Sequence, residues 1–317
     1  MRRFVLRRFA FMALSLIGAT AVVFAMSRMT GDPLLLYATP GYGLTPEQEA
    51  SLRAELNLDR PLVMQYVLWL GNVLQGDLGR TLLDRQKVTV VIGQKIGNTL
   101  QLGLAAWLFS VLVGIPLGVL SAVKRGTAWD YAGRIFALLG IATPSFWIGL
   151  MAIYLFAVAL KWLPAGAKNP YEGFPLSWTN IKYFIMPAIV LGWGPAAGFL
   201  RVTRSAMLEI LDSEFVKFAR AKGVSGRTVI WKHAFKNALI PPLTLIALTM
   251  AGFITGTVVI ETVFSWPGLG ATAVTAVFSN DFALLTGIVL IFIVAFSLVN
   301  FIADVAYAII DPRIKYS

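Results

Sequence analysis

The sequence predicts an all-α membrane protein: one bundle of six transmembrane helices with an external helical insertion and a long basic cytoplasmic loop. Hydrophobic residues make up 57% of the 317 residues and charged residues only 14%, whereas soluble domains carry about 25% charged residues. Uncharged stretches also recur that reach the length needed to cross the hydrocarbon core, about 20 apolar residues. Each stretch is interpreted as a helix, because a helix satisfies its own backbone hydrogen bonds in lipid.

Six stretches are predicted to span the membrane. They are Phe9–Ser27, Ile96–Val123, Ile135–Leu160, Tyr183–Leu200, Asn237–Ile260 and Phe282–Ala303. The first is longer than the apolar region of a signal peptide, about 7–15 residues, which favours a retained anchor. A seventh uncharged stretch, Thr262–Asn280, contains Trp266-Pro267-Gly268, which would break a spanning helix. It is predicted to be an external loop at the membrane surface, with a short helix after Gly270.

The distribution of Lys and Arg predicts the orientation. Of the 27 such residues, four precede the first span, three lie in Lys124–Arg134, eight in Arg201–Lys236 and two after Asp311, together 17; the opposite side holds 10. The denser side is expected to be cytoplasmic. Both termini are therefore predicted to lie inside the cell.

Three regions follow from this topology: residues 1–30, a cytoplasmic segment and the first span; residues 31–95, the external insertion; and residues 96–317, the five-helix core with its cytoplasmic loop 201–236. In the insertion, Thr45 and Pro46 open a helix to about Leu56, by N-cap and first-turn preferences. A second helix follows Pro61 and stops at Gly76. The pair is expected on the outer membrane surface, where it either only packs against the bundle or also contacts a soluble partner.

The loop 201–236 predicts a helical elbow. Asp212-Ser213-Glu214 place acids and a cap at a helix start, and Gly223 supplies its stop. Ser225 is the predicted cap of a second helix, with Val224 and Val229 at the positions of a hydrophobic staple. On the first helix Phe215, Phe218 and Ala219 form a small apolar face that could enter a groove on a partner. The alternative is a basic loop resting on anionic lipid.

Several residues inside the spans suggest bending or polar contacts. Gly114–Gly118, Thr143-Pro144-Ser145, Pro187 and Pro195 are suited to kinks, although each alone could serve packing. Glu261 and Asp304 lie at span ends, where an interfacial or buried polar contact is favoured over a place on a solute path.

Other classes of function find little support. The chain has no cysteine and one histidine, which argues against disulfides, thiolate chemistry and a multi-histidine metal centre. Gly223-Val224-Ser225-Gly226 resembles the serine string of rhomboid proteases, but it lies in a charged loop. A secondary transporter or channel for a small solute remains the alternative function. Such a protein would show internal repeats and ionisable residues at the membrane midplane, and the sequence shows neither clearly. Nucleic-acid binding has no support beyond net charge.

The residues of the loop resemble a known family. Glu214 to Gly223, continuing through His233 to Pro241, is similar to the signature loop of binding-protein-dependent ABC permeases of the dipeptide/oligopeptide/nickel branch. Segments along nearly the whole chain, including Gly31-Asp32-Pro33, Thr203–Glu209, Glu261–Gly270 and Asp311-Pro312-Arg313, resemble the B-type subunits of that branch. The wider superfamily has Glu-Ala-Ala at the positions held here by Lys217, Phe218 and Ala219. This difference weakens the resemblance to sugar permeases and leaves the resemblance to the peptide branch intact.

The resemblance implies a type I ABC importer permease of the bacterial inner membrane. It implies that the elbow contacts an ATPase subunit through a set of eight residues: Glu214, Phe215, Phe218, Ala219, Arg220, Ala221, Lys222 and Gly223. It also implies a second homologous permease subunit, two cytoplasmic ATPase subunits and an external substrate-binding protein. ATP and Mg²⁺ would be bound by the ATPases and no cofactor by this chain, in which no Gly-Lys dipeptide of a P-loop occurs.

Overall fold

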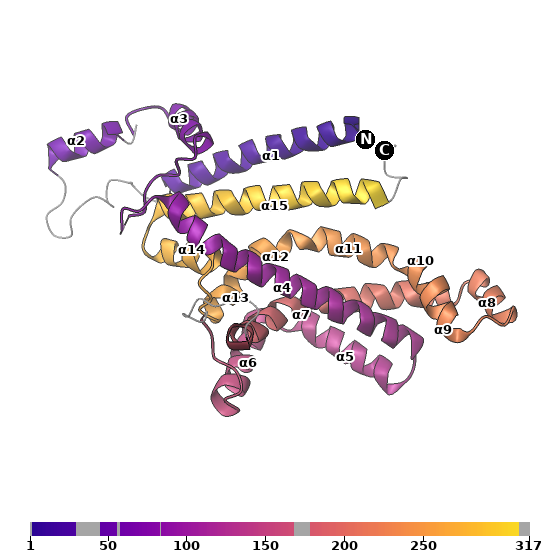
Figure 1. The fold of residues 1–317 in the computed structure, drawn as a ribbon. Helices are drawn as coiled ribbons and strands as arrows, with labels where there is room; N and C mark the ends of the chain where they lie inside the picture. The colour runs from indigo at the N-terminus through magenta and orange to yellow at the C-terminus, as the bar shows by residue number, and fades with distance from the viewer. Residues whose placement is uncertain (1, 30–44, 56–57, 83, 168–177, 311–317) are drawn as a thin grey trace. The chain divides into compact units, whose positions relative to one another are not determined.

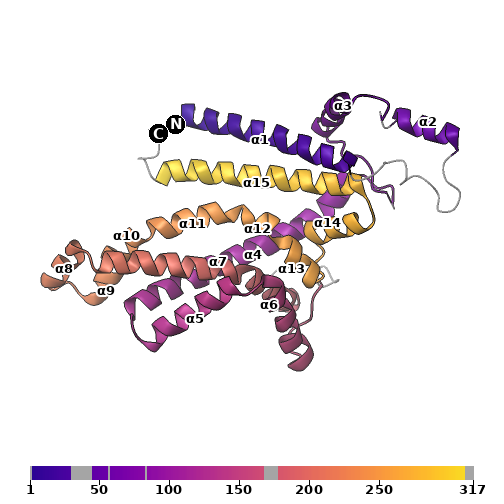
Figure 2. The ribbon, with the colours of Figure 1, turned by 180° about the vertical axis from the view of Figure 1, so that it is seen from behind.

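The computed structural model describes residues 2–29, 45–55, 58–82, 84–167 and 178–310. Helices dominate this part of the chain (Figures 1 and 2). In chain order they are α1 Arg2–Met29, α2 Pro46–Glu55, α3 Leu62–Leu74, α4 Val88–Val123, α5 Ala128–Ala142, α6 Ser145–Ala152, the π-helical η2 Ile153–Ala159, α7 Trp178–Leu211, α8 Glu214–Ala221, α9 Gly226–Thr228, the π-helical η3 Val229–Phe235, α10 Lys236–Ala238, α11 Ile240–Met250, α12 Gly252–Thr255, α13 Thr257–Val263, α14 Leu269–Phe278 and α15 Phe282–Ile310.

The chain forms two compact units. The first unit comprises residues 1–97 and 268–301, and the second unit comprises residues 98–267 and 302–317.

The core of the first unit joins the start of α4 to α14 and α15. Val88, Ile92, Leu269 and Ile288 are among its buried side chains. Asp281 caps α15, since its carboxylate accepts from the backbone N–H of Leu284 at 3.0 Å, and it also accepts from the N–H of Leu82 at 2.7 Å. One carboxylate therefore fixes both the start of α15 and the segment that leads into α4.

Helix α3 packs on α1 within the same unit. The rings of Tyr66 and Trp69 lie 5.6 and 5.4 Å from that of Phe24, and the hydroxyls of Thr20 and Tyr66 are hydrogen-bonded at 2.9 Å. The two predicted helices of the insertion are confirmed as α2 and α3. Gly76 follows α3 with a φ of 83°, in the left-handed region that glycine adopts most readily.

In the second unit α4 and α7 approach closely. A Cβ on Gly114 would lie 2.5 Å from the carbonyl oxygen of Ala196, and one on Gly118 would lie 2.7 Å from that of Leu200. Such small residues, four apart, let two membrane helices pack backbone against backbone. Of the two interpretations of Gly114–Gly118, a bend or packing, the structure supports packing: α4 is continuous there, and the glycines contact α7. Pro187 and Pro195 likewise lie inside a continuous α7.

The predicted third span is divided into two arms. The chain bends by 108° between helix α5 and the α6–η2 segment, around Thr143 and Pro144, because proline removes a backbone donor and its predecessor avoids helical torsion angles. The predicted kink is confirmed here. Its bend is large enough to divide the predicted span into two helices that point in different directions.

The predicted fifth span, Asn237–Ile260, is not one uninterrupted helix. It forms α10 to α13, with breaks at Leu239, Ala251 and Gly256, all of which keep right-handed helical torsion angles. Within the described residues, four helices and the bent α5–η2 pair are long and apolar enough to cross a membrane: Leu6–Met26, Val88–Val123, Asn180–Leu211 and Phe282–Ala303, with the pair Ala128–Ala142 and Ser145–Ala159. The 237–260 segment misses this criterion only through its interruptions.

The segment between α13 and α15 is broken before Gly268 and carries the short helix α14, as predicted, but Trp266 differs from expectation. Its side chain is 2% exposed and donates from Nε1 to the carbonyl oxygen of Asn98 at 3.0 Å, while Asn98 donates to that of Pro267 at 2.8 Å. Trp266 is thus a buried anchor in the second unit and is not a side chain on the surface of a loop. Glu261, also fully buried, accepts from the Thr99 hydroxyl at 2.7 Å, which agrees with the predicted polar contact. The side chain of Asp304 lies outside the described residues.

Candidate functional site: the helical elbow and the charged cluster behind it

The elbow is the part of the second unit formed by residues 212–236. Figures 1 and 2 show α8 and α9 at one end of this unit, beyond the end of α7. Helix α7 continues to Leu211, eleven residues past its predicted end at Leu200. The elbow is therefore carried by a long, packed helix and not by an irregular loop.

Gly223 ends α8, as the sequence predicts. Its φ is 79°, and its N–H donates to the carbonyl oxygen of Arg220 at 2.9 Å while the N–H of Val224 donates to that of Ala219 at 3.2 Å. These two bonds form a complete Schellman motif, which satisfies the carbonyls that the last turn of a helix leaves open.

The second helix of the elbow begins two residues later. The hydroxyl of Ser225 accepts from the backbone N–H of Thr228 at 3.4 Å, which confirms Ser225 as the N-cap. Val229, at the second position of the predicted staple, is fully buried. The end of α8 and the start of α9, each with its own capping hydrogen bonds, thus meet at Gly223 and Val224. Together they fix the direction of α8.

The predicted apolar face is present and open. Phe215 and Phe218 are 44% and 62% exposed, and Ala219 is half-buried. The ammonium group of Lys222 lies 4.5 Å from the centre of the Phe218 ring, which is a favourable cation–π distance. Two aromatic rings in a helix of eight residues therefore remain available to a partner.

The remaining predicted contact residues lie around these rings. Glu214, Arg220, Ala221 and Gly223 are all exposed. Glu214 accepts from Lys217 at 2.8 Å, and this contact raises the pKa of Lys217. The elbow thus presents apolar rings bordered by charges, which is the usual layout of a protein–protein contact.

Two features of the elbow differ from the prediction. Ser213 occupies the N-cap position of α8, but its hydroxyl donates back to the carbonyl oxygen of Ile210 at 2.5 Å and makes no capping bond. The side chain that attaches α8 to the unit is Val216, which is fully buried and which the sequence interpretation did not single out. Its position on the face away from Phe215 and Phe218 is the signal that could have identified it.

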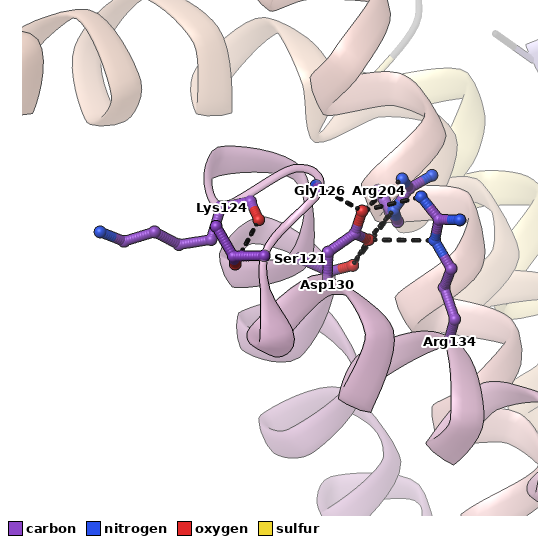
Figure 3. Close-up of polar contacts among 7 residues, drawn as sticks. Ser121, Lys124, Gly126, Asp130, Arg134 and Arg204 are labelled. Carbon is purple, nitrogen blue, oxygen red and sulfur yellow. Dashed lines mark hydrogen bonds and ion pairs between the residues drawn. The ribbon is translucent and has the colours of Figure 1, made fainter.

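A charged cluster where α4, α5 and α7 come together was not predicted (Figure 3). Asp130, near the start of α5, is fully buried. Its carboxylate accepts from Arg204 of α7 at 2.8 and 3.1 Å and from Arg134 at 3.2 and 2.8 Å. It also accepts from the Ser121 hydroxyl at 2.7 Å and the Gly126 N–H at 3.0 Å.

The cluster ties three helices together. Ser121 belongs to the end of α4, Asp130 to the start of α5 and Arg204 to α7. Asp130 lies in the predicted loop Lys124–Arg134, before the apolar span. Its hydrogen bonds from Arg204 above all, then from Gly126, Ser121 and Arg134, outweigh desolvation and hold the pKa of Asp130 far below its usual range. The carboxylate is therefore ionised at any physiological pH.

Sequence reasoning missed this cluster for a physical reason. Asp130 and Arg134 have the spacing of four that allows a helical ion pair, but an exposed pair of this kind is common and carries little energy. Arg204 is 74 positions from Asp130, and only the packing of α5 on α7 brings the two together. An additional ion pair, Arg125 to Asp212 at 3.7 Å, links the α4–α5 turn to the α7–α8 junction.

The serine string at 223–226 has a structural use. The hydroxyl of Ser225 caps α9 and is hydrogen-bonded to that of Thr228 at 2.9 Å. Within the described ranges, acidic and histidine side chains form no group of three or more that could hold a metal ion.

Comparison with known proteins identifies the family. The model of the binding-protein-dependent transport system inner membrane component matches residues 114–316, and the model of the N-terminal part of the membrane component of such systems matches residues 1–102. A protein of Brucella suis biovar 1 named as a peptide permease is 39% identical over 99% of both chains. The dipeptide transport system permease protein DppB of Escherichia coli K12 is 38% identical over 100% of this chain and 99% of its own length.

A solved structure shows the same fold. In the inward-facing MetNI methionine ABC transporter, a chain with 16% sequence identity superimposes with a TM-score of 0.56 over 70% of this chain and 96% of its own length. The match supports the predicted type I permease fold. With two family models that cover most of the chain and full-length relatives near 40% identity, this chain belongs to the family of inner-membrane components of binding-protein-dependent transport systems.

Proposed function

We propose that this chain is the permease subunit of an ATP-driven importer, that it forms half of a translocation path for di- or oligopeptides, and that it has no enzymatic activity of its own. The observation that carries the proposal is the end-to-end similarity, 38–39%, to proteins named as peptide and dipeptide permeases. The proposed complex adds a second homologous permease subunit, two cytoplasmic ATPase subunits and an external substrate-binding protein.

The elbow is proposed to be the contact with the ATPase. The support is its geometry: Phe215 and Phe218 are exposed on a short helix whose other face is held by buried Val216, and Gly223 fixes the helix end. Exposed aromatic side chains bordered by charges are suited to a groove on a protein. A loop resting on lipid would have no need of a turn fixed at both helix ends.

The mechanism follows from these contacts. ATP-bound and ATP-free arrangements of the ATPases bind the elbow in different positions, and that difference in binding free energy shifts the permease between outward-open and inward-open states. The chain itself supplies a rigid elbow, the packed α4–α7 pair and the break at Pro144. The orientation proposed from the Lys and Arg distribution, with both termini and the elbow in the cytoplasm, places the elbow on the side where ATP is available.

The test is transport by the reconstituted complex. Proteoliposomes that contain both permease subunits, the ATPases and the binding protein should import labelled peptide only when ATP is supplied. Uptake should persist when ion gradients are dissipated. Uptake that follows an ion gradient without ATP would instead establish a secondary transporter, and import without any companion ATPase would refute the proposal.

The identity of the solute is tested at the binding protein encoded beside this subunit. Calorimetric titration with dipeptides, longer peptides, glutathione and nickel chelates would rank these ligands. Each ligand that binds is then tested in the transport assay, and binding of peptides with no uptake of them would contradict the peptide assignment.

A further inference from the structure

The cluster around Asp130 joins the segments that surround the elbow. Arg204 is seven residues before Leu211, where α7 ends, and α8 begins three residues after Leu211. Asp130 holds the start of α5, and Ser121 lies in the last turn of α4. The end of α4, the start of α5 and α7 about two turns before its end therefore meet on one buried carboxylate.

Helix α8 itself packs on η3 and on α7. Val216 is its only buried residue, and Arg125 of the α4–α5 turn is paired with Asp212 in front of α8 with both side chains largely exposed. Exposed ion pairs of this kind are worth little. The bonds between Arg204 and Asp130 are short, shielded from water and charge-assisted, which makes them the strong link between α7 and the α4–α5 turn.

The chemistry of the cluster also specifies its geometry. Two guanidinium groups and the Ser121 hydroxyl occupy both carboxylate oxygens, and Nε of Arg204 also lies 3.1 Å from the Ser121 hydroxyl. A carboxylate with its positions filled in this way favours one arrangement of the three helices, because loss of Arg204 would leave the buried charge with only the half-exposed Arg134 as its ionic partner. Lysine could not reproduce the fork of Arg204.

We propose that Asp130 is a positioning residue for the transport cycle: with Arg204 it locks α7 to the α4–α5 turn, so that a displacement of α8 by the ATPase moves α4, α5 and α7 as one body. The proposal rests on the proposed function of the elbow as the ATPase contact. It assigns to Asp130 no contact with the solute or with ATP. Loss of the lock should therefore separate ATP hydrolysis from transport.

The experiment measures how many ATP molecules are hydrolysed per peptide imported by the full complex in proteoliposomes. Asp130→Asn keeps the size of the side chain and removes its charge. The amide nitrogen of asparagine cannot accept the hydrogen bonds that one carboxylate oxygen now accepts. We expect the ratio of ATP to peptide to rise at least about tenfold, since the loss of a single charge-assisted hydrogen bond already corresponds to that factor. Lys124→Gln is the matched control: it removes a cation from the same turn, where its side chain points away from the carboxylate (Figure 3), and it should leave the ratio unchanged.

A second measurement tests the rigid body directly. The chain contains no cysteine, so spin labels can be placed at Lys217→Cys on α8 and Trp129→Cys on α5, both exposed. In the wild-type background the distance between them should change little between the ATP-bound and ATP-free states, whereas with Asp130→Asn it should broaden or shift. A merely stabilising residue would lower the amount of assembled complex without changing the coupling ratio or this distance.

The outcomes are decisive. An assembled Asp130→Asn complex with an unchanged ratio and an unchanged distance overturns the proposal. Should Asp130→Asn fail to assemble, Arg204→Lys, which keeps the charge and loses the fork, is measured in its place and must show the raised ratio. If the wild-type complex does not couple ATP to uptake at all, the proposed function of the elbow has failed, which is distinguishable from failure of the lock.

Discussion

Replacement of Gly223 tests the elbow at the residue on which its shape depends. Gly223 has a φ of 79°, and a Cβ at this position would have no atom within 4 Å. Any effect of a side chain here is therefore one of backbone conformation and not of collision. An L-residue in this region costs about 1–2 kcal/mol, and a β-branched residue is a genuine outlier there.

That free energy shifts the equilibrium between the closed turn and an unravelled helix end by about 5- to 30-fold. Gly223→Val should accordingly reduce ATP-dependent peptide uptake at least about fivefold. Gly223→Asn should have a smaller effect, since asparagine tolerates left-handed torsion angles. Substrate-stimulated ATP hydrolysis should fall in parallel, while the complex still assembles.

The matched control is three residues away. Gly226 is also exposed and has open space around its Cβ position, but its φ does not lie in the left-handed region. Gly226→Val should retain most of the uptake. If peptide uptake by Gly223→Val equals that of wild type and of Gly226→Val, then the turn at Gly223 is not needed to couple ATP hydrolysis to transport. That result would refute the reasoning.

Four further predictions address the fold and its charges. Val216→Ala should destabilise the elbow by roughly 2 kcal/mol, from lost apolar burial and the cavity left behind, and should speed proteolysis there, whereas Phe218→Ala, at an exposed ring, should not; equal proteolysis would contradict the anchor role. Gly118→Val would force α4 from α7 and should lower stability by about 1–3 kcal/mol in thermal unfolding, while Gly93→Val, which meets open space, serves as its control. Because the folded pKa of Asp130 is depressed, its contribution to stability is present above the unfolded pKa of about 3.9 and is lost as pH falls toward the folded value; thermal unfolding should show no dependence on this group from pH 8 to pH 5, and Asp130→Asn should make the loss in stronger acid smaller than in wild type. If α3 lies on the outer membrane surface, a spin label at Val67→Cys, where the side chain is 56% exposed, should be more accessible to oxygen than to a water-soluble nickel reagent. The exposed Asn72→Cys should show the reverse, and a soluble partner on α3 would instead exclude both reagents from Val67.

Local chemistry was predictable from the sequence, and distant packing was not. The stop at Gly223, the cap at Ser225 and the helices α2 and α3 follow from preferences that act within a few residues. The continuity of α4 through Gly114 and Gly118 depends on α7, so glycines that suggested a hinge are contact points. The burial of Trp266 depends in the same way on Asn98, 168 positions earlier.

In the candidate site, too, the local features were predictable and the contacts between distant residues were not. The exposed face of α8 was predicted because Phe215 and Phe218 share a side of one helix. The charged cluster was not, because no spacing along the chain relates Arg204 to Asp130. The interruptions of the 237–260 segment at Ala251 and Gly256 were also missed, since an uninterrupted apolar composition predicts a helix but not its local breaks.

The length of α8 has a consequence for how the elbow exists from moment to moment. Eight residues are fewer than the 12–15 that an isolated helix needs to persist in water, so α8 keeps its shape only while Val216 stays docked. Amide protons of this helix should then exchange with solvent much faster than those of α7. Binding of a partner protein would slow that exchange. The exchange rate of α8 would therefore report whether the partner is bound.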